Sequence, residues 1–218
     1  MKLRSRLVVL TLICLSVSMI PTLAAFPEGV GDMASRGCTC HGSGVDDGTV
    51  TKIHNLPENF TKNQTYILVF SVDSDVKVVN GAQGGFSLWY SAGSFELTEE
   101  IQLMDGRLTH TTSGNGKRVW VVNWSAPDWD DDQVDFQLHA NAVNGDAETT
   151  GDQWDTYTIS VRGTNQTGPL NDPSVPTIDE EIPAAGASST LISIGFAAIS
   201  LTLIRQRNSI DKFDISRS

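Results

Sequence analysis

The sequence predicts an all-β protein: an antiparallel β-sandwich of about seven or eight strands, carried between two segments that direct the chain to a membrane. Short runs of alternating apolar and polar residues recur between residues 48 and 163, separated by Gly, Asn, Asp and Pro. This is the pattern of half-buried strands and turns. No window of comparable length shows a helical period, so a sandwich is favoured over mixed folds, and its size favours it over a barrel.

The chain begins with the features of a secretory signal peptide over residues 1–24. Three basic residues precede an apolar run over 7–20, and small residues follow at Ala24 and Ala25. This order is typical of a cleaved leader, with an uncleaved signal anchor as the alternative. Cys14 lies inside the apolar run, so cleavage leaves Cys38 and Cys40 as the cysteines of the mature chain.

We expect a Cys/His loop over residues 25–47 and the sandwich over residues 48–163. The clearest strands carry apolar side chains at every second position, and they lie at 65–73, 86–90, 118–125, 133–143 and 155–163. Because successive side chains of a strand point to opposite faces, each of these runs is expected to place one face in the core.

The C-terminal part is expected to anchor the domain to a membrane. Residues 164–183 are rich in Thr, Asn, Gly, Pro, Asp and Glu, which is typical of a flexible stalk. The uncharged run over 182–204 would reach roughly 34 Å as a helix, enough to cross a bilayer core of about 30 Å. We therefore predict a transmembrane helix over 184–204 and, because basic residues follow it, a cytoplasmic tail over 205–218. This end is also similar to the sorting tails of archaeal and bacterial surface proteins.

The exported part of the chain is strongly acidic. The 218 residues include 15 Lys and Arg against 26 Asp and Glu, a net charge of −11. Between residues 25 and 183 the counts are 8 basic against 24 acidic residues, so this part carries −16. Such a surface repels phosphate backbones and suits a salty medium, divalent cations or cationic partners. Nucleic acid is therefore excluded as an expected partner.

Four N-glycosylation sequons lie in the part of the chain expected outside the cell. They begin at Asn59, Asn63, Asn123 and Asn165. Modification requires an exposed site in an exported protein. We prefer Asn165, in the expected stalk, and place Asn123 on the solvent face of its strand. Chance matches are the alternative for some of the four.

The most informative motif is the string RGCTCHGS, which brings together Cys38, Cys40 and His41. Covalent haem c attachment uses two cysteines followed directly by a histidine, because thioethers hold the haem vinyl groups while the imidazole ligates the iron. The spacing here is C-x-C-H, one residue shorter than the usual motif. Either Cys38 reaches its vinyl group from a tighter loop, or Cys40 alone is attached.

Three other interpretations of this motif stay open. Cys38 and Cys40 could form a small, strained, redox-active disulfide. Both thiolates and His41 could bind Cu or Zn with a fourth ligand from the sandwich. The segment could also be a thiol-containing loop without chemistry, or one that forms an intermolecular disulfide.

Seven strings along the chain resemble the secreted "choice-of-anchor V" domain proteins, which are related in character to Ig-like, reelin-type (reeler) sandwich domains. The resemblance covers residues 37 to 163, and its strings are, in order, GCTCHG at 37–42, NLPENF at 55–60, QTYILVFSV at 64–72, GGFSL at 84–88, LTHTTSGN at 108–115, WVVNWSAP at 120–127 and NAVNGDAETTGDQW at 141–154. The resemblance implies a reeler-like sandwich. Many relatives carry the full C-x-x-C-H motif, so it also implies a haem c-like or redox role for the N-terminal loop.

A haem c usually takes a second axial ligand. The mature chain offers His54, His110, His139, Met33 and Met104. We prefer His110, which lies in the LTHT string, in an expected turn region without strand pattern. His139 is the second choice, on the polar face of its strand. An ordinary surface histidine is the alternative for both.

A carboxylate-dense turn, APDWDDDQVD, is a weak candidate for Ca²⁺ through Asp128, Asp130 and Asp132. The spacing lacks the central glycine and terminal glutamate of an EF-hand, so a solvated acidic turn is favoured. The Asn/Gly/Asp-rich string over 141–154 could bind a ligand or simply connect two strands. The sequence has no Ser/His/Asp motif, phosphate-binding glycine loop or HExxH motif, so we do not expect a hydrolase or transferase.

The sequence thus predicts a cell-surface, membrane-anchored sandwich whose C-x-C-H loop carries haem c, or Cu or Zn, for electron transfer to a redox partner or for sensing. The alternative is a noncatalytic extracellular module for adhesion or ligand binding, with its activity in the loops near Asp130 or Asn144.

Overall fold

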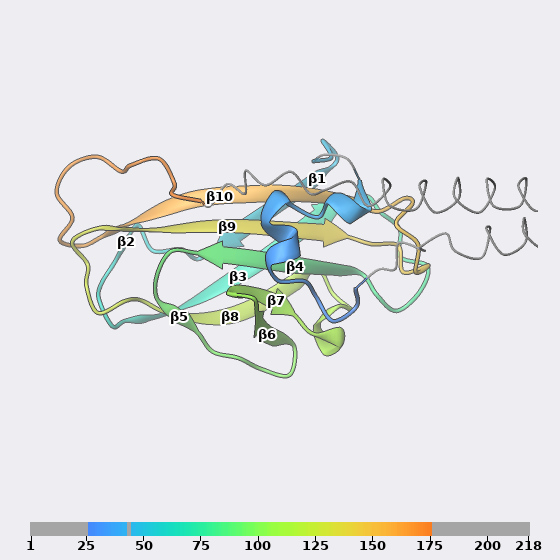
Figure 1. Cartoon of the computed structure of the whole chain (residues 1–218), viewed down its shortest axis with the longest axis horizontal. Helices are drawn as coiled ribbons and strands as arrows, with labels where there is room; N and C mark the ends of the chain where they lie inside the picture. Colours follow the sequence, from blue (N-terminus) through green and yellow to red (C-terminus); the bar gives the residue numbers. More distant parts are fainter. Residues whose placement is uncertain (1–25, 43–44, 176–218) are drawn as a thin grey trace, which may run out of the picture. The chain divides into compact units, whose positions relative to one another are not determined.

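Two β-sheets packed face to face make up most of the computed structural model, which describes residues 26–42 and 45–175 (Figure 1). The chain divides into two units, residues 1–178 and 179–218, and all of the described residues belong to the first. The architecture is therefore the all-β sandwich that the alternating pattern predicted.

The first sheet has four strands in the order β1-β3-β8-β5: β1 (Thr49–His54), β3 (Thr65–Ser74), β8 (Val119–Ser125) and β5 (Ser94–Phe95). The second has six strands in the order β2-β10-β9-β4-β7-β6: β2 (Asn59–Phe60), β10 (Gln153–Gly163), β9 (Gln133–Ala142), β4 (Gly84–Tyr90), β7 (Arg107–His110) and β6 (Ile101–Met104). Neighbouring strands are antiparallel except β2 and β10, which pair in parallel.

All five strands singled out in the sequence are present, and eight of the ten strands have four residues or more. The two others, β2 and β5, have two residues each, too few to give a periodic signal. The expectation that His110 lies in a turn was wrong, because it ends β7, all of whose residues are buried. With four residues and one apolar side chain, β7 is too short to give a periodic signal.

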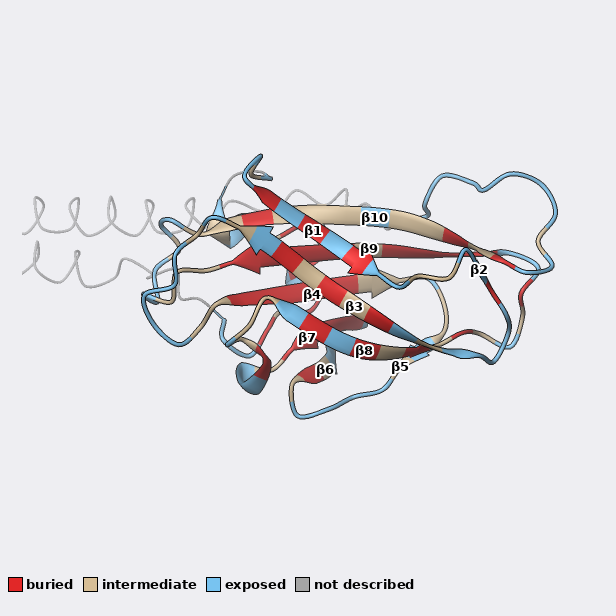
Figure 2. Ribbon diagram, turned by 180° about the vertical axis from the view of Figure 1, so that it is seen from behind, coloured by how far each residue is buried: buried red, intermediate tan, exposed pale blue. Residues whose placement is uncertain are grey.

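Large aromatic side chains fill the space between the sheets. Trp120 and Trp124 from the first sheet are fully buried. Their rings lie 5.0 Å from Phe86 and 5.1 Å from Phe136, both in the second sheet. Figure 2 shows the resulting alternation of buried and exposed residues along β1, β3 and β8. Each aromatic side chain buries on the order of 150–250 Å², so these pairs account for much of the hydrophobic stabilisation.

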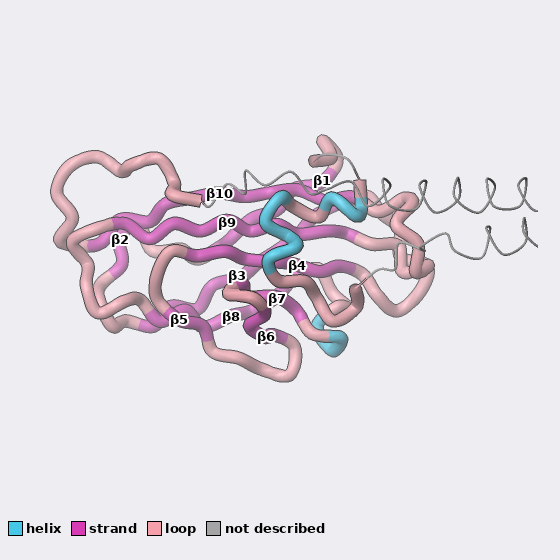
Figure 3. The backbone as a smooth tube through the Cα atoms, viewed as in Figure 1, coloured by secondary structure: helices cyan, strands magenta, loops and turns pink. Residues whose placement is uncertain are grey.

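The outer face of the second sheet is covered by the N-terminal segment, residues 26–42. This segment contains two short 3-10 helices, η1 (Asp32–Arg36) and η2 (Thr39–His41), which cross the sheet over β4 and β9 (Figure 3). Nine of the ten residues of β9 are buried, and its outer face is covered partly by this segment and partly by residues 171–174, which bond to Gln133 and Asp135. The segment expected as a loop is therefore a packed element of the fold.

Residues 164–175, expected as the start of a flexible stalk, are bonded to the sandwich. Asn165 donates its side-chain amide to Asp130 at 2.9 Å. The backbone N–H of Asn171 reaches Gln133 Oε1 at 2.7 Å. This part of the predicted stalk is thus held along the domain by side chains of the second sheet and its loops.

The predicted signal peptide, transmembrane helix and cytoplasmic tail, like the rest of the predicted stalk, lie outside the described residues. Within the described residues, no helix combines the length and apolar character needed to span a membrane.

Candidate functional site

A pocket of about 330 Å³ lies between the N-terminal segment and the outer face of the second sheet. Cys38, Cys40, His41 and His110 all line it. These are the residues of the C-x-C-H motif and the preferred second axial ligand, and they come from two segments about seventy residues apart in the chain. The fold therefore gathers the principal sequence-predicted site residues around one space, which we call the Cys/His pocket.

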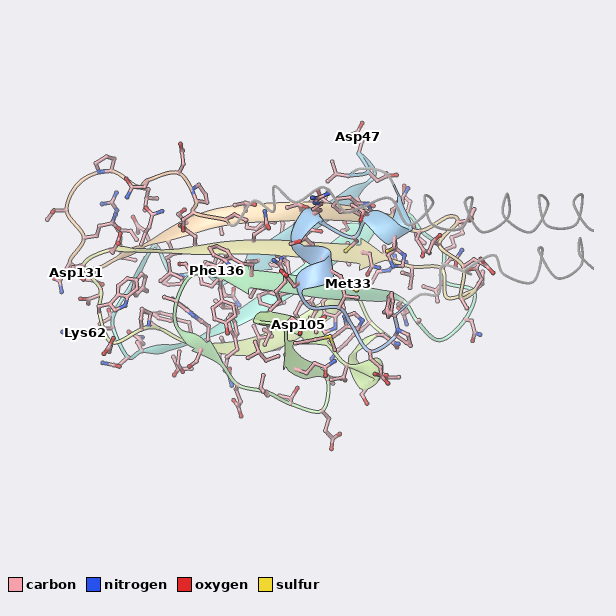
Figure 4. All side chains as sticks on the ribbon, in the orientation of Figure 1. Met33, Asp47, Lys62, Asp105, Asp131 and Phe136 are labelled. Carbon is pink, nitrogen blue, oxygen red and sulfur yellow. The ribbon has the colours of Figure 1, made fainter. Side chains whose placement is uncertain are left out.

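The walls of the Cys/His pocket are mostly apolar. The N-terminal segment contributes Phe26, Val30, Met33 and Ala34, and the sheet contributes the flat backbone around Gly84 and Gly85 together with Phe86. Phe26 and Met33 remain largely exposed, and Figure 4 shows Met33 above the ribbon of β4. Apolar walls with a few convergent polar groups are typical of small-molecule and cofactor sites.

His41 is held by a carboxylate that is distant in the sequence, from the segment just before β10. Its Nδ1 lies 2.7 Å from Asp152 Oδ2, and the Asp152 side chain is almost completely buried. The second oxygen of Asp152 accepts the backbone N–H of Asn144 at 3.0 Å. Since one ring nitrogen is occupied in this way, Nε2 is the nitrogen left for a ligand.

His110 lies buried at the end of β7, with Nδ1 3.1 Å from the backbone N of Phe86 and 3.3 Å from its carbonyl oxygen. Its Nε2 has no hydrogen-bond partner among the described residues. Burial lowers the pKa of His110, the hydrogen bond to Phe86 raises it, and the nearby His41 lowers it further. A neutral imidazole, which this environment favours, is the form that ligates a metal.

Gly85 provides the space for the His110 ring. A Cβ at position 85 would lie 2.9 Å from Nε2 and still closer to Cε1 of the imidazole. A side chain at this position of β4 would therefore displace the imidazole from the pocket wall.

The two cysteines are free thiols in different environments. Cys40 is exposed, whereas Cys38 is partly covered. Burial raises the pKa of Cys38 to about 12, with a further increase from neighbouring Cys40 that Arg107 partly offsets. Only a thiolate is strongly nucleophilic, so Cys40 is the more available of the two for covalent chemistry.

Three buried polar residues lie beneath the N-terminal segment with one atom each unpartnered within the described part of the chain: Arg107 Nη2, His139 Nε2 and Asn141 Oδ1. His139 is 3% exposed and His110 is 8% exposed, so the alternative of an ordinary surface histidine was wrong for both residues. The strand of His139 was correctly assigned, but the N-terminal segment covers the face expected in solvent. His139 does not line the Cys/His pocket, and its Nδ1 pairs with Thr156 at 2.7 Å.

The aspartates of the predicted Ca²⁺ turn differ in burial. Asp130 is buried and accepts hydrogen bonds from Asn165 and Lys62, whereas Asp128 and Asp132 are exposed. This turn lies at the end of the sandwich where Asp131 and Lys62 are labelled, away from Met33 (Figure 4). Over residues 26–42 and 45–175, no three His, Cys, Asp or Glu side chains are grouped as ligands of a metal ion.

The predicted glycosylation acceptors differ in accessibility. Asn59 and Asn63 are exposed, while Asn123 is half-buried and donates to Glu96 at 2.7 Å. Asn165, the preferred acceptor, uses its amide nitrogen in the bond to Asp130. Its attachment atom is therefore engaged in the folded domain.

No protein-family model and no curated protein matches this chain. Among solved structures, the chain is similar to the human F-spondin reeler domain, in one fragment at 18% identity over 55% of this chain and 91% of that one, with a TM-score of 0.39. A second fragment of the same human domain gives 17% identity over 57% and 98%, with a TM-score of 0.35. A conjugative transposon lipoprotein from Bacteroides eggerthii gives 11% identity over 52% and 97%, with a TM-score of 0.32. Reeler domains thus stand among the similar structures, as the sequence resemblance implied.

Sequence reasoning missed Asp152 and Gly85 as site residues. The loop over 141–154 was recognised as a candidate binding loop, but nothing in its composition distinguished Asp152 from its neighbours. The signal for Gly85 was its place in the double glycine that opens β4, since glycine inside a strand often marks the close approach of another group.

Proposed function

We propose that this chain is an exported sandwich protein that carries a haem group in the Cys/His pocket for one-electron transfer or redox sensing. The observation that supports it is the convergence of Cys38, Cys40, His41 and His110 on one apolar pocket. A pocket of about 330 Å³ is far larger than a single ion requires, since one water molecule occupies about 30 Å³. The space therefore suits an organic group rather than a bare metal ion.

The residues present fit a haem group in their chemistry. His41 would ligate the iron through Nε2, and His110 would supply the second imidazole from the opposite element, with Met33 as the other donor at the pocket. Cys40 would carry a thioether bond, and Cys38 a second one if its thiol becomes accessible during attachment. When bound, haem supplies an iron centre that exchanges single electrons.

The charge of the pocket indicates how such a group would be retained. The charged side chains that line it among the described residues are Glu148 and Asp152, and neither lysine nor arginine is present there. Haem propionates would find no ionic partner and would remain in solvent. Covalent attachment, principally through Cys40, would therefore be needed to hold the group.

The test is expression of the full chain together with a cytochrome c maturation system, followed by a pyridine haemochrome assay on the denatured protein. We expect covalent haem in the wild type and none in Cys40→Ser. His41→Ala should change the absorption spectrum of the native protein. The matched control is His54→Ala, because His54 lies on β1 and bonds to Ser71 outside the pocket. Absence of covalent haem from the wild type would contradict the proposal.

A second candidate function is noncatalytic binding of a small, uncharged apolar ligand in the same pocket. The exposed apolar rim formed by Phe26 and Met33 favours it. In this case an apolar fluorescent probe would bind the full chain, Met33→Asp would abolish binding, and the double variant Cys38→Ser/Cys40→Ser would leave binding unchanged. If the pocket carries covalent haem instead, the double variant Cys38→Ser/Cys40→Ser should lose the bound group.

We further propose that the domain is displayed on the cell surface and held there by the C-terminal segment. The expected leader, the acidic exported region and the apolar run over 182–204 support this arrangement. Cell fractionation before and after deletion of residues 182–218 tests the anchor, and protease treatment of intact cells tests the orientation. Recovery of the intact chain from the soluble fraction would contradict the anchor.

A further inference from the structure

We infer that Asp152 is the positioning residue of the Cys/His pocket: it holds His41 with Nδ1 protonated, so that the Nε2 electron pair is presented for coordination. The inference deepens the proposed function, since it assigns the group that prepares the first axial ligand. Only the second of its two readouts depends on the proposed haem.

The carboxylate itself is rigidly held. The Asp152 side chain is 1% exposed, against 13% for His41. Oδ2 contacts His41 Nδ1 at 2.7 Å, and Oδ1 accepts the backbone N–H of Asn144 at 3.0 Å. Because both oxygens are engaged, the carboxylate cannot rotate without breaking a hydrogen bond in a buried environment.

The backbone around His41 is attached to the same part of the sheet. Trp154, the second residue of β10, donates Nε1–H to the carbonyl oxygen of Gly42 at 3.2 Å. On the other side of the motif, Gly37 has a φ of 98°, and a Cβ there would overlap the Trp154 ring. Asp152, directly before β10, thus fixes the side chain of the histidine, and Trp154 in β10 fixes the main chain of the motif.

The donor and acceptor properties of the two groups then determine the tautomer. An ionised carboxylate only accepts hydrogen bonds, so a neutral His41 must place its single ring proton on Nδ1. Metal-ligating histidines commonly donate their other N–H to a carboxylate or carbonyl, which fixes the ring and raises its basicity as a ligand. His41 and Asp152 form this arrangement before any ligand is bound.

The first readout is the tautomer of His41 in the metal-free full chain, labelled with ¹⁵N-histidine and measured by NMR at pH 8.5. We expect the Nδ1–H tautomer in the wild type. In Asp152→Asn, the amide can donate to Nδ1, and the ratio of Nδ1–H to Nε2–H should fall at least about 10-fold. His54, bonded to Ser71 outside the pocket, is the internal reference.

The matched control is Glu148→Gln, which removes the same charge from the same pocket wall without a contact to His41. Its His41 tautomer should equal that of the wild type. A wild-type His41 with its proton on Nε2 would overturn the inference, even if Asp152→Asn fails to fold. An unchanged ratio in folded Asp152→Asn would also overturn it.

The second readout uses the haem-loaded full chain and competition by free imidazole. The measured quantity is the concentration of free imidazole that displaces the protein ligand. In Asp152→Asn this concentration should be at least about 10-fold lower than in the wild type, because His41 is no longer oriented. In Glu148→Gln it should equal that of the wild type. Equal concentrations in the wild type and Asp152→Asn would overturn the inference. If no haem is incorporated, the proposed function fails while the tautomer measurement still decides the role of Asp152.

Discussion

Asp135 accepts two hydrogen bonds from Ser174, one from the backbone N–H at 2.8 Å and one from the hydroxyl at 2.9 Å. Its other oxygen accepts from Ser160 Oγ and Gln133 Nε2, each at 2.7 Å. Burial alone would raise the pKa of Asp135, but these hydrogen bonds together outweigh it and lower the pKa below its ordinary value. Asp135 on β9 thereby holds the segment that follows β10 against the second sheet through Ser174.

Asp135→Asn should lower the free energy of unfolding by about 1–3 kcal/mol at pH 7, because the amide cannot accept the same four bonds. The carboxylate contributes its stability above its unfolded pKa and loses it as the pH falls through its lowered folded pKa. The difference between variant and wild type should therefore shrink below about pH 4. Urea unfolding at several pH values measures it. Asp131→Asn, on an exposed side chain, is the control and should behave as the wild type at every pH.

His139 predicts a second pH dependence, at higher pH. Burial, with a smaller contribution from the charge of Arg107, lowers the pKa of His139 to about 4. The unfolded chain therefore binds more protons than the folded chain between about pH 6.5 and pH 4, and stability falls as the pH decreases through this window. A pKa shift of this size lowers the free energy of unfolding by at most about 3 kcal/mol across this window.

His139→Gln should therefore lose less stability than the wild type between pH 7 and pH 4, measured by urea unfolding. His54→Gln, on an exposed strand position, should keep the wild-type slope. Identical slopes for His139→Gln and wild type would show that His139 is not neutral in the fold.

Gly85→Ala should destabilise the protein by about 1–3 kcal/mol, because the added methyl group enters the space of the His110 ring and overpacking of this kind has a cost of that size. Chemical denaturation measures the loss, and the NMR signals of His110 should shift. Gly116→Ala is the matched control, since the nearest atom to its added methyl group is Gly81 O at 3.7 Å. A similar loss in both variants would show that the contact with the imidazole is not the cause.

The two cysteines should differ in their rate of alkylation in the metal-free protein. With a pKa of about 12, Cys38 is ionised in roughly one molecule in ten thousand at pH 8. Iodoacetamide should therefore label the Cys38→Ser variant, through exposed Cys40, at least about 100-fold faster than the Cys40→Ser variant. Mass spectrometry follows the reaction. In urea the two variants should react alike, and a persistent difference there would contradict burial as the cause.

Sequence alone predicted the longer strands in which apolar and polar residues alternate. The alternation in β3 and β8 arises because Leu68, Phe70, Trp120 and Trp124 enter the core while their neighbours meet solvent. It failed for β7, a strand of four residues with a single apolar side chain, Leu108. The signal comes from alternating apolar and polar side chains, which β9 keeps although nearly all of its residues are buried.

The candidate site was predicted only in part. Cys38, Cys40 and His41 were found from their chemistry, and His110 as an available ligand. The polar residues of β9, His139 among them, were taken as solvent-facing because the element that covers them is not adjacent in sequence. Asp152 was missed for the same reason, because its contact with His41 joins residues 111 positions apart in the chain.

That contact also sets an order of events during biosynthesis. The cysteine-bearing segment is made near the beginning of the chain, but the strands on which it lies, β4, β7, β9 and β10, follow it, and β10 is the last strand of the domain. Contacts between distant parts of a chain form late in folding. Cys38, which is partly covered in the folded domain, is therefore most accessible to a modifying enzyme before the final strand pairs, whereas Cys40 stays exposed afterwards.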